Sequence, residues 1–195
     1  MNALRSLRQP ESGTESTQQC SGNEKVMKKV IIIGRSGSGK STFARRLREK
    51  TGLPLYYLDL IWHRSDRTNI TTEEFDRRLM AILREDQWII DGNYLRTLEI
   101  RLQACDTVFL LDYPVDVCLQ GAKERIGTRR EDLPWVETGF DGEFRQWILD
   151  FPNDQLPRIY ELLEQYRDGK EIHIFRSREE AEEWLGTVDS MCELR

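Results

Sequence analysis

The stretch Gly34–Ser41, which reads GRSGSGKS, fits the pattern G-x-x-x-x-G-K-[ST] at every fixed position. It follows the apolar run Val30–Ile33, and the segment behind it, Thr42–Leu47, carries Phe43 and Leu47 one helical turn apart. A strand therefore leads into a glycine-rich loop, and a helix begins where the loop ends. The backbone N–H groups of such a loop and of the helix N-terminus form a cradle for phosphate groups. A flexible Gly/Ser linker is the alternative, but a linker would need neither the strand nor the helix.

The motif predicts the ligand contacts of two side chains in this loop. Lys40 is expected to reach the β- and γ-phosphates of a nucleoside triphosphate, and Ser41 to place its hydroxyl on a magnesium ion. The residues expected to bind the nucleotide are Gly34, Arg35, Ser36, Gly37, Ser38, Gly39, Lys40, Ser41 and Thr42.

Composition narrows the class of protein. The chain has 195 residues, of which 29 are basic and 34 acidic, so its formal net charge is −5. This balance creates no overall attraction for a polyanion, and nucleic acid is not the expected partner.

No apolar run approaches the roughly 18 to 20 residues that span a bilayer, and Cys20, Cys105, Cys118 and Cys192 lack C-x-x-C spacing. We expect a cytoplasmic protein with reduced thiols, no membrane segment and no zinc site; the sequence does not specify its oligomeric state.

The chain divides into a tail and one domain. Residues 1–26 are polar and poor in apolar side chains, which predicts a disordered N-terminal tail, and residues 27–195 are expected to form one folded domain. Helical patterns separate strands that are expected at residues 28–33, 55–58, 88–90, 108–111 and 172–175. One of these helical patterns, the stripe from Phe144 to Phe151, is expected to end at Pro152. The alternation predicts an α/β fold, the P-loop NTPase fold, with a five-stranded parallel sheet covered by helices on both faces.

Acidic residues follow several strands at their carboxyl ends, where ligands collect in a parallel sheet. Asp91 follows Trp88–Ile90 and is expected to hold magnesium, directly or through water; a turn-forming Asp-Gly pair is the alternative. Asp112 is a second candidate for the same role. Asp59 follows the second strand, where its carboxylate would bind an acceptor hydroxyl or accept its proton, and a structural cap is an equal alternative. Nearby Trp62 is expected either to stack on a planar substrate or to pack in the core.

The helical pattern stops across residues 127–142, which we predict to be a loop or a small lid. Arg125, Arg129 and Arg130 cluster where this segment begins, and guanidinium groups match phosphate oxygens in pairs of hydrogen bonds. Acidic residues are interleaved with them, so a salt-bridged surface is the alternative. Phosphoryl transfer needs positive charge in addition to Lys40, which favours a catalytic role for the three arginines.

Six segments of the chain resemble the P-loop kinases related to adenylate kinase, and within them the small proteins known as topology modulation proteins. The segments are GRSGSGKSTFARRL, YYLDLIW, WIIDGNYLRT, TVFLLDYP, KERIGTRRED and IFRSREEA, and the resemblance covers residues 28–186. It implies Mg-ATP on the phosphate loop, a mobile arginine-bearing lid, and transfer of the γ-phosphoryl group to a small acceptor, with nucleotides among the candidates.

The resemblance also implies substrate contacts after the third strand. The pair Asp91-Gly92 is similar to the Asp-Gly of adenylate kinases, and Arg96 stands in for the arginine that follows it there. Residues 93–95, which read NYL, replace the Phe-Pro expected before that arginine. The expected substrate-binding residues are Asp59, Trp62, Asn93 and Arg96.

Two other functions compete with an ATP-dependent kinase. The first is a regulatory NTPase, a nucleotide-binding switch that acts through a protein partner. The N-K-x-D signature of guanine-binding switches does not occur in the sequence. The second is nucleic-acid binding, which the group's name suggests and which the net charge of −5 disfavours. The sequence therefore favours a kinase whose acceptor is a small molecule.

Overall fold

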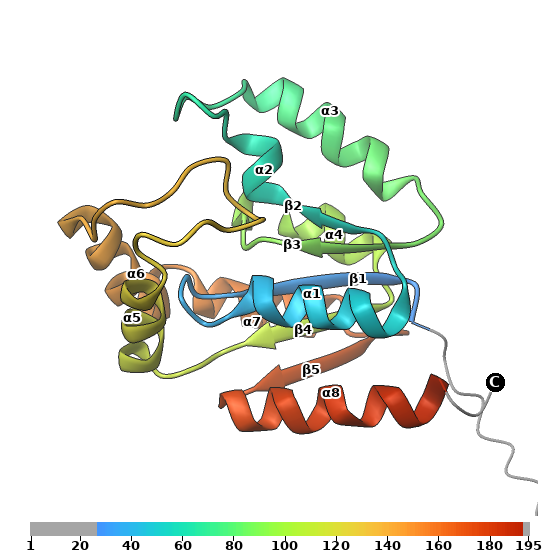
Figure 1. Ribbon diagram of the computed structural model, residues 1–195. Coiled ribbons are helices and arrows are strands. Elements are labelled where there is room, and N and C mark those ends of the chain that lie inside the picture. Colours follow the sequence, from blue (N-terminus) through green and yellow to red (C-terminus); the bar gives the residue numbers. More distant parts are fainter. Residues whose placement is uncertain (1–26, 193–195) are drawn as a thin grey trace, which may run out of the picture.

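The computed structural model describes residues 27–192, so the predicted tail, residues 1–26, lies outside the described residues. In the described part of the chain five strands form one sheet in the order β2-β3-β1-β4-β5, and all neighbours are parallel (Figure 1). The strands are β1 (Lys29–Gly34), β2 (Leu55–Tyr57), β3 (Trp88–Asp91), β4 (Thr107–Leu111) and β5 (Glu171–Phe175). The predicted five-stranded parallel sheet is confirmed.

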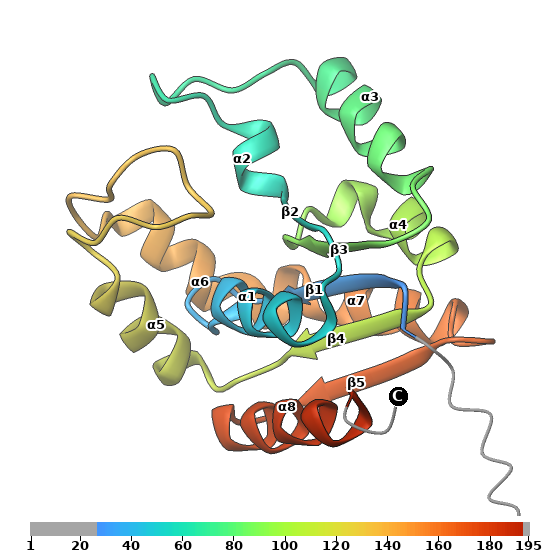
Figure 2. The same ribbon diagram turned by 45° about the vertical axis from the view of Figure 1, so that its right-hand side comes forward.

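Helices cover both faces of this sheet (Figure 2). Side chains of α3, α4 and α7 join the core on one face, and side chains of α1, α5 and α8 join it on the other. The helices are α1 (Lys40–Thr51), α2 (Leu58–Trp62), α3 (Thr72–Leu83), α4 (Leu98–Ala104, behind the 3-10 turn Leu95–Thr97), α5 (Val115–Glu124), α6 (Gly142–Asp154), α7 (Leu156–Gln165) and α8 (Arg178–Cys192).

The central strand β1 shows why the sheet is buried on both faces. Ile31 and Ile33 belong to the core beneath α3, α4 and α7, whereas Val30 and Ile32 belong to the core beneath α1 and α8. All four side chains are fully buried. Because successive side chains of a strand point to opposite faces, an uninterrupted apolar run is what a central parallel strand requires.

Two boundaries differ from the sequence expectation. The second strand ends at Tyr57 and α2 begins at Leu58, so Asp59 lies in the first turn of a short helix and not directly at the end of a strand. Helix α6 continues through Pro152 to Asp154. Proline removes one intrahelical hydrogen bond, but here it lies in the last turn, and the burial of Ile148 and Phe151 holds the helix in place.

The topology gathers the connecting segments at one edge of the sheet. The loop after β1, helix α2 after β2 and the turn after β3 all lie at the carboxyl ends of the strands. The segment 125–141 joins α5 to α6 without a helix or strand, and it extends over this edge toward α2 (Figures 1 and 2). Within residues 27–192, no helix is long and apolar enough to cross a membrane, and Cys105 and Cys118 are free and buried.

Candidate active site

The loop after β1 leaves the N-terminus of α1 open. Gly39 occupies the N-cap position in a left-handed conformation, and no side chain caps the helix there. The first turn of α1 also contains no acidic residue. The backbone N–H groups at this end of the helix therefore remain available to an anion.

Gly37 allows α5 to pack directly against this loop. Its φ is +84°, and a Cβ atom built on it would lie 1.9 Å from the carbonyl oxygen of Cys118. Any larger residue would displace either the loop or α5. The glycine of the motif thus serves both the left-handed turn and the close approach of a helix.

Lys40, the first residue of α1, is folded back onto the loop. Its Nζ donates a hydrogen bond to the carbonyl oxygen of Arg35 at 3.0 Å. Burial lowers the pKa of Lys40, and the negative charges of Asp91 and Asp59 oppose this shift. The ammonium group is therefore held near two carboxylates at the mouth of the phosphate loop.

Asp91 ends β3 and is buried beside Lys40. Burial raises the pKa of Asp91 to about 6, and the positive charge of Lys40 opposes the shift. Among the described residues, the buried Oδ1 of Asp91 and Oγ of Ser38 have no hydrogen-bond partner. These partnerless oxygens, the uncapped N-terminus of α1 and the hydroxyl of Ser41 fit a nucleotide phosphate with its magnesium ion.

Asp59 follows the second strand and Tyr94 follows the third, and a hydrogen bond links the two side chains at the same edge of the sheet. The phenol oxygen Oη of Tyr94 donates a hydrogen bond to Oδ1 of Asp59 at 2.8 Å. Burial raises the pKa of Tyr94, and the negative charge of Asp59 adds to the effect. Tyr94 therefore remains a proton donor and fixes one carboxylate oxygen of Asp59.

Arg101 of α4 holds the turn that follows Asp91. Its side chain is fully buried, and it donates hydrogen bonds to the carbonyl oxygens of Gly92 at 2.8 Å, Asn93 at 3.0 Å and Tyr94 at 2.9 Å. Burial lowers the pKa of Arg101 to about 10. One guanidinium group thus positions three consecutive residues of the site.

The segment 125–141, which we call the lid segment, forms its own network of ion pairs. Arg125 Nε lies 2.9 Å from Glu137 Oε2, and Arg130 Nη1 lies 2.8 Å from the same oxygen. Arg130 Nε also donates to Asp132 Oδ1 at 2.9 Å. Two of the three arginines that were expected to meet phosphate are therefore paired with carboxylates of their own segment.

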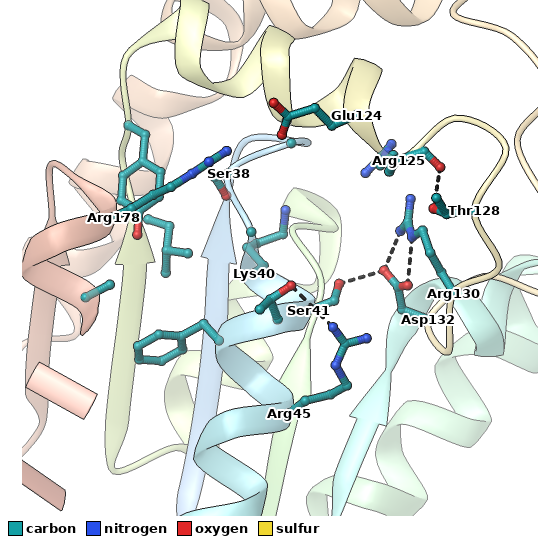
Figure 3. A pocket seen from close by; sticks show the side chains of 18 of the residues that line it. Ser38, Lys40, Ser41, Arg45, Glu124, Arg125, Thr128, Arg130, Asp132 and Arg178 are labelled. Atoms are coloured by element: carbon teal, nitrogen blue, oxygen red, sulfur yellow. Dashed lines mark hydrogen bonds and ion pairs between the residues drawn. The ribbon is translucent and has the colours of Figure 1, made fainter. Parts of the chain in front are cut away.

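Asp132 connects this network to the phosphate loop. Its Oδ2 accepts a hydrogen bond from Ser41 Oγ at 2.6 Å, and Figure 3 shows Arg130, Asp132 and Ser41 in one chain of contacts. Burial opposes ionisation of Asp132, but the hydrogen bonds and charge of Arg130 outweigh it and keep the pKa of Asp132 below its usual value. The lid segment is thus tied to α1 through an ionised carboxylate.

Two cavities flank these residues. The loop cavity, of about 500 Å³, lies between the phosphate loop, the end of α5 and the start of α8. The lid cavity, of about 740 Å³, lies between Asp59, the turn after β3 and the lid segment. Both cavities are lined by Lys40, Ser41, Arg125, Arg130 and Asp132.

The start of α8 contributes Arg178 to the loop cavity (Figure 3). A Cβ atom built on Gly121 would lie 3.0 Å from Arg178 Nη2 and 2.3 Å from the carbonyl oxygen of Gly37. Because residue 121 is a glycine, there is room beside it for both the phosphate loop and Arg178.

Most of the expected site residues lie around these cavities. Asn93 lines the lid cavity and donates from Nδ2 to Gln155 Oε1 at 2.6 Å. Arg129 is exposed and lines the loop cavity together with Thr42. Arg35, by contrast, lines neither cavity: its side chain is buried with the guanidinium 5.4 Å from the centre of the Phe151 ring, and its carbonyl oxygen accepts the hydrogen bond from Lys40.

Two expected substrate contacts lie elsewhere. Trp62 packs edge-on against Phe75 and Tyr94 and lines neither cavity. Arg96 pairs with Asp76 at 2.6 Å and also lines neither cavity. The position of Trp62 agrees with the core-packing alternative stated above.

Sequence reasoning did not single out Arg101, Asp132, Glu137 or Arg178. Arg101 lies in a short helix whose other charged residue is Glu99, and an arginine is usually exposed. Asp132 lies in a run of alternating charges that is typical of a solvated surface. Tyr94 was within the quoted block WIIDGNY, but nothing in the residue type predicted its contact with Asp59. Only the folded chain reveals these contacts.

Comparisons with known proteins agree with this architecture. No protein-family model matches the chain. The sequence is 28% identical to an adenylate kinase of Thermotoga neapolitana over 92 residues, which are 46% of this chain and 41% of that protein. The chain thus matches about two fifths of the length of its curated relatives.

Solved structures extend the likeness over most of the chain. The shikimate kinase of Acinetobacter baumannii in complex with shikimate has a TM-score of 0.53 and 19% identity, covering 85% of this chain and 93% of that one. A shikimate kinase of Bacteroides thetaiotaomicron has a TM-score of 0.52 and 15% identity, covering 86% and 99%. At sequence identities this low, the likeness to these structures is evidence for a shared fold alone. The predicted α/β P-loop NTPase fold is confirmed, and the sequence match agrees with the predicted resemblance to P-loop kinases related to adenylate kinase.

Proposed function

We propose that this protein is a phosphotransferase that moves the γ-phosphoryl group of Mg-ATP to a hydroxyl group of a small acceptor. The observation that carries the proposal is the meeting of the loop cavity and the lid cavity at shared side chains, among them Lys40, Arg125 and Arg130. A reaction between two bound molecules requires such a meeting point, because both must be held in contact.

The loop cavity is suited to the triphosphate. Lys40 would give up its hydrogen bond to the carbonyl oxygen of Arg35 and bind the β- and γ-phosphates instead. The N–H groups at the uncapped N-terminus of α1 would also donate hydrogen bonds to the phosphates. Magnesium, held through Ser41 and Asp91, would neutralise charge on the phosphates. Arg125 and Arg130 would add positive charge on the transferring group.

The lid cavity is suited to the acceptor. During transfer, the acceptor's hydroxyl oxygen bonds to the γ-phosphorus while the bond between that phosphorus and the β–γ bridging oxygen breaks. The hydroxyl proton passes to the carboxylate of Asp59. Tyr94 holds Oδ1 of that carboxylate and leaves its other oxygen for the acceptor.

An acceptor screen with ATP labelled in the γ-phosphate tests the proposal. We expect label to appear in one small acceptor, and this transfer to disappear in Lys40→Ala. Hydrolysis without transfer to any acceptor would favour the regulatory NTPase. A chain that does not bind ATP would contradict both functions.

A further inference from the structure

Five aromatic residues contribute to the walls of the lid cavity. Its lining includes Tyr94, Trp135, Phe140, Phe144 and Trp147. Phe144 and Trp147 lie with ring planes 9° apart and centroids 6.3 Å apart, and Trp147 keeps 39% of its surface exposed. Arg125 lies over the Phe144 ring at 5.2 Å, so the exposed ring of Trp147 is the flat surface on which a planar group can stack.

The charges in this cavity are unfavourable for an anion. Its lining contains five carboxylates and four cationic side chains. Arg125 and Arg130 are both paired with Glu137, and Arg67 lies over the Trp135 ring at 6.0 Å. The carboxylates are Asp59, Asp91, Asp132, Glu137 and Asp141, and the cations are Lys40, Arg67, Arg125 and Arg130.

A phosphate group on the acceptor would therefore find few partners, because among the described residues Arg67, which lies over the Trp135 ring, is the one arginine of this lining without an ion pair to a carboxylate. A phosphate monoester carries between one and two negative charges and needs arginine or lysine partners. Arg96 is bound to Asp76 outside the cavity. If Arg125 and Arg130 left their carboxylates for the transferring phosphoryl group, they would still be unavailable to the acceptor's own phosphate.

The lining also offers hydrogen-bond acceptors that are free for a ligand. Asn93 Oδ1 is buried without a partner among the described residues, and Asp59 keeps one carboxylate oxygen beside the bond from Tyr94. Groups of this kind select a ligand that donates hydrogen bonds, such as a hydroxyl or an amino group.

Building on the proposed function, we infer that the acceptor is a neutral compound with a flat ring and a hydroxyl group, of the nucleoside class and not a nucleoside monophosphate. The ring lies against Trp147, its donors face Asn93, and the hydroxyl to be phosphorylated faces Asp59.

Calorimetry on the full chain tests the inference with matched ligand pairs. With magnesium and a non-hydrolysable ATP analogue present, each ribonucleoside and deoxynucleoside is compared with its 5′-monophosphate. We expect at least one nucleoside to bind at least about tenfold more tightly than its monophosphate, the reverse of what a phosphate-binding site would give. Ribose without a base should not bind detectably, because it cannot stack.

Variants of the aromatic wall complete the experiment. Trp147→Ala should weaken nucleoside binding at least about fivefold, and Trp147→Phe, which keeps a ring, should weaken it less. Met80→Ala, which removes an exposed apolar side chain outside both cavities, should have no effect. Unchanged affinity in Trp147→Ala would overturn the assignment of the wall.

The two proposals fail in different ways. If the ATP analogue binds but monophosphates bind more tightly than nucleosides, or no nucleoside binds, the acceptor class is wrong while phosphoryl transfer stands. If the analogue itself does not bind, the proposed function fails and the acceptor class fails with it.

Discussion

Ser41 Oγ donates a hydrogen bond to Asp132 Oδ2 across 2.6 Å, which joins α1 to a residue 91 positions further along the chain. A hydroxyl whose proton is held by a carboxylate turns its oxygen lone pairs toward other partners. In the proposed complex that partner is magnesium. Asp132 would therefore position Ser41 for the metal when the lid segment covers the loop.

The first prediction follows from this contact. Asp132→Ala should raise the magnesium concentration for half-maximal activity about tenfold, since a hydrogen bond to a charged group is worth about 1.5–3 kcal/mol. Ser41→Ala should act in the same direction, and the double variant should add little to the single ones, because both remove one interaction. Glu131→Ala, an exposed neighbour, is the control. Fully additive effects would contradict the positioning role.

The second prediction concerns Lys40. Lys40→Ala should lower kcat at least about tenfold and weaken ATP binding, because a positive charge aimed at the β- and γ-phosphates is lost. The melting temperature should stay within a few degrees, since the side chain supports a loop and not the core. Lys28→Ala, an exposed lysine outside both cavities, should behave like the parent. Normal turnover in Lys40→Ala would refute the loop's role.

The third prediction separates proton transfer from structure at Asp59. Asp59→Asn keeps the shape of the side chain and should reduce transfer at least about a hundredfold, while ATP affinity is retained. Tyr94→Phe should reduce transfer less, because it removes only the hydrogen bond that orients the carboxylate. Asp168→Asn, an exposed aspartate, is the control. Equal losses of thermal stability and activity in Asp59→Asn would favour a capping role instead.

The fourth prediction concerns the buried Arg101. Arg101→Met keeps most of the volume but leaves the carbonyls of Gly92 and Asn93 without their donor, whereas the carbonyl of Tyr94 keeps the N–H of Thr97. Each buried acceptor without a donor costs roughly 1–3 kcal/mol, so the melting temperature should fall by at least about 5 °C.

In the same variant the KM for the acceptor should rise more than the KM for ATP, since the released turn lines the lid cavity. Arg84→Met on the surface of α3 is the control. Equal changes in both KM values would show that Arg101 has a general structural role.

The fifth prediction tests the arginines of the lid segment. Arginines that reach a transferring phosphoryl group are worth about 10³ to 10⁵ in rate, whereas surface ion pairs contribute about 0–1 kcal/mol of stability. Arg125→Ala and Arg130→Ala should each lower kcat at least about tenfold, and lysine should restore activity only in part. Arg145→Ala on α6 is the control.

A lid must also open for substrates to enter. Residues 127–142 should therefore be cut by protease more slowly when a non-hydrolysable ATP analogue is bound. Normal turnover of both alanine variants, together with cleavage that nucleotide does not slow, would refute the lid assignment and favour the regulatory switch.

The sequence was sufficient for the fold because the deciding signals are local. The run Val30–Ile33 and the motif Gly34–Ser41 predicted a buried strand, a glycine-rich loop and a helix start, and the strands that followed were found within a few residues of their expected places. Asp91 and Asp59 were singled out because each stands next to the end of an apolar strand, and both line the lid cavity. The errors were also local: a one-turn helix at α2 and a helix that continues through Pro152.

Tertiary structure alone decided which polar groups meet at the site. The contacts between Ser41 and Asp132, and between Tyr94 and Asp59, join residues 91 and 35 positions apart. Residue type and spacing do not specify such distant pairs, because several arginines and carboxylates on the lid segment are chemically equivalent until the chain is folded. Burial in the folded chain then distinguishes these residues from one another. Asp132 is buried against α1, whereas the neighbouring Arg129 and Glu131 are exposed to solvent.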